Sequence, residues 1–171
     1  MTFTRLVVAG VGGALAGAAG TLAMDLLWYS RYRRGAGNDP FPDWETATGT
    51  TSYEGASAPA RTGKRMMELL LHREPPEGSA RAMTNVVHWS TGCAWGALYG
   101  VVEASTGVQP LVGGVALAAS AWTSTYVLLP PLGVYQPIWK YDAPTLLKDA
   151  SAHVTYGMTT ATVVAMLRRS R

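Results

Sequence analysis

Long apolar stretches alternate with one long polar segment along this chain of 171 residues. The apolar stretches cover about residues 6–29, 86–102, 111–129 and 146–167, and the polar segment covers 30–84. The period-two alternation of a barrel strand is missing, whereas glycine and alanine recur at helical spacing. A stretch of about 20 apolar residues crosses a hydrocarbon core of roughly 30 Å. The pattern therefore predicts an all-α fold, an integral membrane bundle of four transmembrane helices in which the whole chain is a single membrane domain.

The second apolar stretch carries a stripe of small residues headed by a histidine. His88, Gly92, Gly96 and Gly100 follow one another at steps of four, which places them on one face of a helix. Glycine at this spacing, the GxxxG pattern, lets a second helix approach backbone to backbone within a membrane. We therefore expect the other helices to pack around this stretch.

The first apolar stretch has a rival interpretation as a cleaved signal peptide. Arg5 precedes it, and small residues crowd the range Ala14 to Gly20. The apolar run nevertheless continues well past those small residues, and Arg31, Arg33 and Arg34 then follow as a stop-transfer cluster. The sequence therefore favours a spanning helix, with a glycine-rich face of its own.

The polar segment 30–84 is predicted to be mainly loop, because Gly, Asn, Asp, Pro, Ser and Thr dominate its first half. Residues 58–72 are the exception and predict a short helix with apolar residues beside Arg61, Lys64 and Arg65. Two roles are open for this helix, binding to the membrane surface or capping the ends of the bundle. A later loop holds Tyr135, Trp139 and Tyr141, which resemble an aromatic interface belt.

Composition supports a membrane location and excludes several functions. Charged residues make up 15% of the chain, against about 25% in soluble domains. The mean hydropathy of +0.09 is low for a membrane protein, because the apolar stretches are rich in Gly, Ala, Ser and Thr and because the long polar segment lowers the average. The net charge of +3 is small, and the basic residues do not form the basic helix face that is expected of a nucleic-acid-binding protein. The single cysteine, Cys93, excludes an internal disulfide and multi-cysteine metal motifs.

Four spans would place both chain ends on one face, side A, and the long loops on the other, side B. Four ionisable residues then fall at a common depth just inside side B: Asp25, His88, Asp149 and His153. Asp149 and His153 share a helix face because they are four apart, and Gly157 continues that face as a packing position. Three aromatic residues are expected to line this polar cluster: Trp122, Tyr126 and Tyr156.

Several roles remain open for the polar cluster. Interhelical hydrogen bonds would tie the helices together, at about 0.6–2 kcal/mol each. A proton-linked or small-solute site is the main functional reading, because Asp and His serve as proton relays in membranes. Binding of Zn²⁺ or Fe²⁺ and a bis-histidine haem on His88 and His153 are not favoured, since ligand motifs are missing and close helix packing leaves little room. The sequence thus predicts no metal and no other cofactor.

The chain contains no nucleophile motif and no phosphate-binding loop, so enzymatic activity is not favoured. A lipid-active membrane enzyme built on Asp and His stays open as an alternative.

The C-terminal half resembles the YagU-like family of small bacterial inner-membrane proteins. The resemblance covers roughly residues 85–169 and rests on HWSTGCAWGALYGVVE, LLPPLGVYQPIW, KDASAHVTYG and the closing arginines. His88, Glu103, Gly133 and His153 match the family pattern by position. The resemblance implies a multi-pass protein of the bacterial cytoplasmic membrane, without an established biochemical activity.

We therefore expect a non-enzymatic accessory or assembly protein of the inner membrane, in contact with the lipid bilayer and with a homo-oligomer or membrane-protein partner. The alternative is an oligomeric transporter, proton-coupled or ion-conducting, that uses the polar cluster. Lys and Arg are more numerous near side B, which favours a cytoplasmic side B, although the arginines at the C-terminus oppose this.

Overall fold

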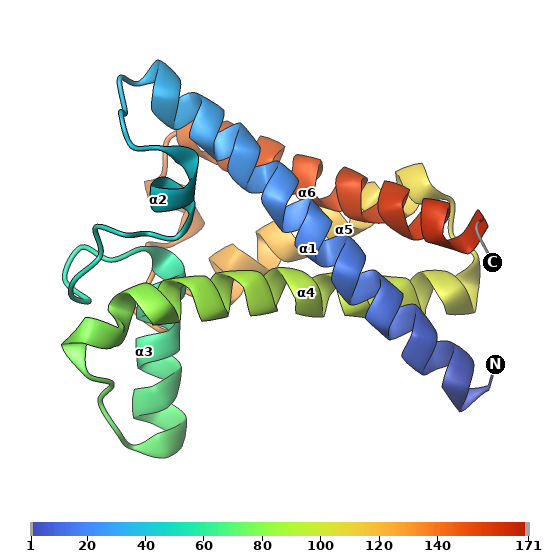
Figure 1. The fold of residues 1–171 in the computed structure, drawn as a ribbon, viewed down its shortest axis with the longest axis horizontal. Coiled ribbons are helices and arrows are strands. Elements are labelled where there is room, and N and C mark those ends of the chain that lie inside the picture. Colours follow the sequence, from blue (N-terminus) through green and yellow to red (C-terminus); the bar gives the residue numbers. More distant parts are fainter. Residues whose placement is uncertain (1, 170–171) are drawn as a thin grey trace. The chain divides into compact units, whose positions relative to one another are not determined.

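The structure is a computed structural model that describes residues 2–169, and every regular element in this range is a helix (Figure 1). The all-α prediction is therefore confirmed. The helices in chain order are α1 Phe3–Arg34, α2 Phe41–Glu45, α3 Ala58–Leu71, the 3-10 helix η1 Glu77–Ser79, α4 Ala80–Thr106, α5 Pro110–Leu128, the 3-10 helix η2 Ile138–Lys140 and α6 Ala143–Arg169.

Three of the four long helices extend beyond the apolar stretches that predict them, because polar residues stabilise their ends. The positive charges of Arg31, Arg33 and Arg34 lie in the last turn of α1, where they interact favourably with the helix dipole. At the start of α6, the backbone N–H of Thr145 donates to the Asp142 carboxylate at 3.0 Å, as an N-cap does. Hydrogen bonds from Thr145, its hydroxyl first, lower the pKa of Asp142.

Two of the four predicted spans meet a test of length and apolar composition. α1 and α5 are long and apolar enough to cross a membrane. α4 and α6 are each 27 residues long. Their Gly, Ser, Thr and His residues keep them below the apolar content that the test requires. By this criterion residues 2–169 contain two candidate spans instead of four.

The helices contribute to two compact units. The first unit contains residues up to Trp28, Thr91–Ser124 and the chain from Asp142 onward, and so combines α1, the main part of α4, α5 and α6. The second unit contains Tyr29–Ser90 and Thr125–Tyr141, which include α2, α3, η1, η2 and the first turns of α4.

In the first unit, α1 crosses α4 with their backbones in direct contact (Figure 1). A Cβ atom built on Gly17 would overlap the carbonyl oxygen of Gly92 and lie 3.0 Å from Cα of Gly96. A Cβ on Gly100 would lie 2.9 Å from Cα of Gly13. The predicted glycine stripe of α4 thus faces the glycine-rich face of α1, and only residues without side chains fit at this crossing.

The second unit shows that segment 30–84 is not a loop throughout. Its helix α2 begins next to Pro42, which suits a first helical turn, and the Trp44 ring packs at 5.4 Å from the Tyr29 ring and at 6.4 Å from the Phe41 ring. The prediction of a loop was wrong for α2, because aromatic contacts stabilise this short helix. The Gly and Pro content of the segment does not indicate such contacts.

Helix α3 begins at Ala58 as predicted and ends at Leu71, before His72 in the left-handed conformation. Its small residues Ala60 and Gly63 are buried, and a Cβ on Gly63 would meet the side chains of Met83 and Val87 on α4. Leu69, which lies opposite Ala60 on the helix, is exposed, and so is Leu70 near the C-terminal end. One face therefore packs on α4, and the other has no partner among the described residues.

Candidate functional site

The Asp149 and His153 side chains lie together on the first turns of α6. His153 Nδ1 lies 3.0 Å from the Asp149 carbonyl oxygen and 3.5 Å from its carboxylate Oδ1. A carbonyl oxygen only accepts a hydrogen bond, so this geometry places a proton on Nδ1. Both side chains are more than four-fifths buried. The spacing of four residues thus produces a close pair within one helix, as the helical repeat requires.

Asp25 lies in the first unit as well, on the buried face of α1. It is 5% exposed, and Thr21 one turn earlier is also buried, with its hydroxyl donating to the Gly17 carbonyl at 3.0 Å. Gly17, Thr21 and Asp25 therefore occupy one face, the face that meets α4. His88 belongs to the second unit, where its ring lies edge-on to the ring of Trp89.

The three aromatic residues expected to line the cluster are divided between the two units. Trp122 and Tyr156 belong to the first, and Tyr126 belongs to the second. The Tyr126 ring packs against Tyr135 at 5.7 Å and against Tyr141 at 5.5 Å. Two residues of the predicted aromatic belt therefore surround Tyr126, whereas the third, Trp139, is exposed.

Tyr156 joins two helices of the first unit. Its hydroxyl donates to the carbonyl oxygen of Gly92 at 2.6 Å, from α6 to α4, and the side chain is buried. Gly157, the next residue, faces a different helix, because a Cβ built on it would overlap the Gly114 carbonyl oxygen of α5. Two adjacent residues of α6 therefore contact two different helices, Tyr156 contacting α4 and Gly157 contacting α5.

Within residues 2–169, no three His, Cys, Asp or Glu side chains are grouped so that they would hold a metal ion. The alternative of a Zn²⁺ or Fe²⁺ site on the Asp and His residues therefore gains no support from their positions.

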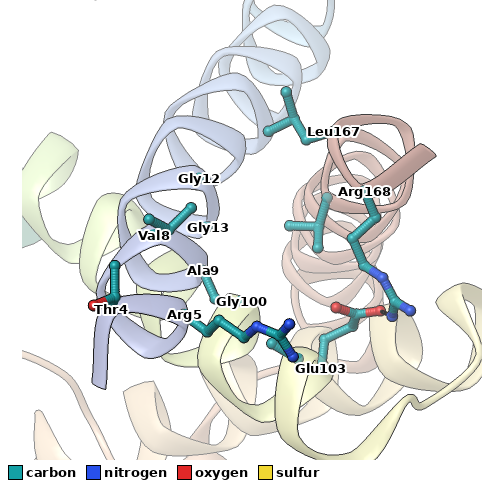
Figure 2. Close-up of a pocket in the computed structure, with 12 residues that line it drawn as sticks. Thr4, Arg5, Val8, Ala9, Gly12, Gly13, Gly100, Glu103, Leu167 and Arg168 are labelled. Atoms are coloured by element: carbon teal, nitrogen blue, oxygen red, sulfur yellow. Dashed lines mark hydrogen bonds and ion pairs between the residues drawn. The ribbon is translucent and has the colours of Figure 1, made fainter. Parts of the chain in front are cut away.

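A pocket that sequence reasoning missed lies between α1, α4 and α6 in the first unit (Figure 2). Its volume is about 390 Å³, and its polar lining includes Arg5, Glu103 and Arg168. Glu103 is buried, and Arg168 forms an ion pair with it. In the sequence, Glu103 directly follows the apolar stretch 86–102 and matches the family pattern, and neither feature predicts a pocket. The signal was present, since the predicted topology puts Glu103 and the terminal arginines on the same side A.

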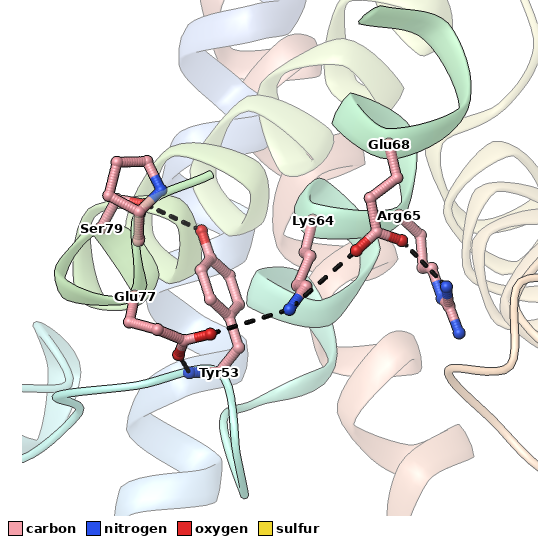
Figure 3. A network of polar contacts seen from close by, with 7 residues as sticks. Tyr53, Lys64, Arg65, Glu68, Glu77 and Ser79 are labelled. Atoms are coloured by element: carbon pink, nitrogen blue, oxygen red, sulfur yellow. Dashed lines mark hydrogen bonds and ion pairs between the residues drawn. The ribbon is translucent and has the colours of Figure 1, made fainter. Parts of the chain in front are cut away.

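The second unit holds a network of charges around Tyr53 (Figure 3). Its backbone N–H donates to the Glu77 carboxylate at 2.9 Å, and its hydroxyl lies 3.0 Å from the hydroxyl of Ser79. Lys64 lies 5.2 Å from the Tyr53 ring centroid and 3.8 Å from Glu77. These contacts join the segment before α3 to α3 and to η1. Opposite charges alternate within the network, which suits a structural role.

Comparisons of the chain with protein-family models, with curated proteins and with solved structures find no match. The resemblance to the YagU-like family therefore stays a prediction.

Proposed function

We propose that the first unit is a four-helix bundle immersed in a lipid bilayer, and that the protein is a non-enzymatic accessory or assembly subunit of the bacterial inner membrane. The observation that carries the proposal is an inverted distribution of residue sizes in this unit. Small residues occupy the helix crossings in its interior, beside a few large side chains such as Tyr99, Leu117 and Tyr156, and many large apolar residues cover its surface.

The inversion is clear on α1. Ala16 has 0% exposure, whereas the neighbouring Leu15 is 66% exposed. Only 28% of the most apolar window of α1 is buried, and only 33% of that of α5. A core helix of a soluble protein has most of such a window buried, and a soluble monomer rarely exposes apolar patches beyond a few hundred Å². In lipid the same surface costs nothing, and small residues at helix contacts are the usual packing solution.

The same distribution extends to α4 and α6, the helices of lower hydropathy. Leu98 on α4 and Met166 on α6 are exposed. The interior positions of these helices hold Gly92, Gly96 and Thr160. A helix whose small and polar residues face other helices needs fewer large apolar residues to be compatible with lipid. The distribution therefore supports four spans, although hydropathy alone selects two.

An accessory role fits the surface of α5. Its glycines face the other helices of the bundle, whereas a second set of small residues on this helix is exposed. This set is Ala116, Ala119, Ser120 and Thr123. Small residues four apart on a lipid-facing surface allow another helix to approach closely. We propose that this surface contacts a second copy of the chain or another membrane helix.

The transporter hypothesis remains the second candidate, because the Asp149–His153 pair joins two ionisable side chains that are mostly buried. Its test is proton flux in proteoliposomes, with Asp149→Asn and His153→Gln as variants. The hypothesis would be excluded if the parent protein shows no proton flux. It would also be excluded if both variants show the same flux as the parent.

Alkaline carbonate washing of bacterial membranes tests the immersion itself. We expect the protein to stay in the pellet and to dissolve only in detergent, and release by carbonate would refute the proposal. Reporter fusions at Gly78 and at Gly107, which flank α4, test the number of spans. Four spans predict opposite sides for these two fusions, whereas two spans, α1 and α5, predict the same side.

The contact surface of α5 is tested by cysteine cross-linking in a Cys93→Ser background. We expect Ala119→Cys to form a disulfide-linked dimer or a linked complex in native membranes. Val11→Cys on the exposed face of α1 is the matched control and should remain unlinked. Equal linking of both variants would remove the support for a specific surface.

A further inference from the structure

The pocket between α1, α4 and α6 combines an apolar groove with a charged end. Val8 and Gly12 of α1 and Val164 and Leu167 of α6 line the groove. Figure 2 shows Arg5 and Arg168 extending from opposite helices toward Glu103 at the α4 side. The volume of about 390 Å³ lies within the range of roughly 300–1,000 Å³ that is typical of ligand pockets. An elongated ligand with one anionic end would match both parts.

The charges at this end are not balanced. Glu103 is buried and forms an ion pair with Arg168, so these two charges compensate each other. Arg5 lines the same pocket, and no hydrogen bond or ion pair of its guanidinium is found among residues 2–169. One positive charge is therefore available to a ligand. An arginine fork binds phosphate oxygens in a bidentate manner, and Arg168 presents a second guanidinium held in place by Glu103.

We propose that this pocket binds an anionic phospholipid of the surrounding leaflet, with its phosphate at Arg5 and Arg168 and an acyl chain along Val8, Gly12 and Leu167. The proposal rests on the immersion of the first unit in lipid. Basic pockets between transmembrane helices are known to bind anionic head groups, and each arginine contributes about 1 kcal/mol of attraction at a membrane surface. The apolar groove distinguishes this ligand from a soluble anion, which would use the arginines alone.

The test uses the full chain, purified in a non-ionic detergent. Phosphatidylglycerol and phosphatidylcholine with identical acyl chains are added separately, and native mass spectrometry counts the lipids retained by each protein molecule. We expect the parent protein to prefer phosphatidylglycerol about fivefold, which corresponds to the contribution of one arginine. Equal retention of the two lipids would overturn the proposal.

Two pairs of variants distinguish lipid binding in the pocket from binding that depends only on the net charge or hydrophobicity of the protein. Arg5→Gln should abolish the preference, whereas Arg169→Gln, at an exposed position outside the pocket lining, should keep it. Val8→Trp fills the groove and should lower retention of phosphatidylglycerol. Val7→Trp, also exposed but outside the lining, should not. Equal effects within either pair would refute a specific site.

Inorganic phosphate distinguishes the lipid from a free anion. An excess of phosphate at the concentration of a typical buffer should leave the bound phosphatidylglycerol in place, because phosphate lacks the acyl chain. Displacement by phosphate would overturn the lipid assignment in favour of a soluble anion. Failure of this proposal is distinct from failure of the membrane proposal, since a protein without lipid preference would still resist carbonate washing.

Discussion

The crossing of α1 and α4 permits a sharp test, because two glycines of α1 differ in their surroundings. A Cβ atom on Gly17 would overlap the carbonyl oxygen of Gly92 and lie 3.0 Å from Cα of Gly96. A Cβ on Gly10 would have its nearest neighbour at 3.6 Å, the Cγ2 of Val101, which is an ordinary contact. Gly17→Ala must therefore push the two helices apart, whereas Gly10→Ala fits without movement.

The two substitutions share one favourable effect, since alanine stabilises a helix by roughly 0.5–1 kcal/mol relative to glycine. Overpacking at Gly17 adds a cost of about 1–3 kcal/mol, because backbone atoms that lie in contact cannot rotate away as a side chain does. We expect Gly10→Ala to equal or exceed the parent in stability, and Gly17→Ala to lie about 1–3 kcal/mol below Gly10→Ala. The common helix effect cancels in that difference.

The free energy of unfolding is measured in mixed micelles of a mild detergent and dodecyl sulfate, with circular dichroism as the signal. Both variants carry the same change of one methyl group, so their difference reports the helix contact alone. If Gly17→Ala is as stable as Gly10→Ala, the two helices are not in backbone contact and the reasoning about the crossing is refuted.

Three further predictions concern other parts of the chain. Tyr156→Phe should cost about 0.6–1.7 kcal/mol in the same unfolding assay, because its hydroxyl donates to the Gly92 carbonyl. Tyr99→Phe should cost nothing, since the buried Tyr99 hydroxyl has no hydrogen-bond partner among residues 2–169, and equal costs would contradict this. The pKa of Asp142 is lowered in the folded protein, so its cap stabilises α6 above the ordinary value of 3.8 and is lost as the pH falls through the lower folded value. The parent should therefore exceed Asp142→Asn in thermal stability by a larger margin above pH 3.8 than below it, and a margin that does not change with pH would contradict this. Replacing the exposed Leu69 by Glu should reduce cross-linking of α3 to photoactivatable lipid if this face lies on the membrane surface, and unchanged cross-linking would exclude that location.

Spacing along the sequence predicted which residues share a helix face, because the helical repeat fixes this locally. Gly92, Gly96 and Gly100 lie on one face of α4, and Gly17 and Asp25 on one face of α1. A small-residue face also indicates that another helix approaches closely. It does not identify that helix. For example, Gly157 packs on α5, and its spacing from the Asp149–His153 pair did not predict this partner.

Contacts between distant residues depend on how each helix is rotated and where it crosses its neighbours. The ion pair of Glu103 and Arg168 joins residues 65 positions apart. Both lie in segments that carry the family resemblance, but the resemblance does not pair them. The predicted topology placed both residues near side A. An ion pair requires this, but it also requires that the two helices be neighbours and that the two side chains face each other. The same limit applies to α2, whose Trp44 packs with aromatic residues that the composition of a polar segment does not connect.

The difference between two and four candidate spans follows from what hydropathy measures. Hydropathy averages over all faces of a helix, so it penalises a helix whose interior face is polar or small. In α6 the interior residues Tyr156 and Thr160 lower the average, although Val154 and Met166 on the outer face are exposed and apolar. A bundle held together by glycine, alanine and single hydrogen bonds places most of its large apolar residues outside, because close approach of the backbones leaves little room for them at the helix crossings. Exposure of large side chains on every long helix of the first unit is thus the expected consequence of glycine packing, and the low mean hydropathy of the chain is a second consequence of the same packing.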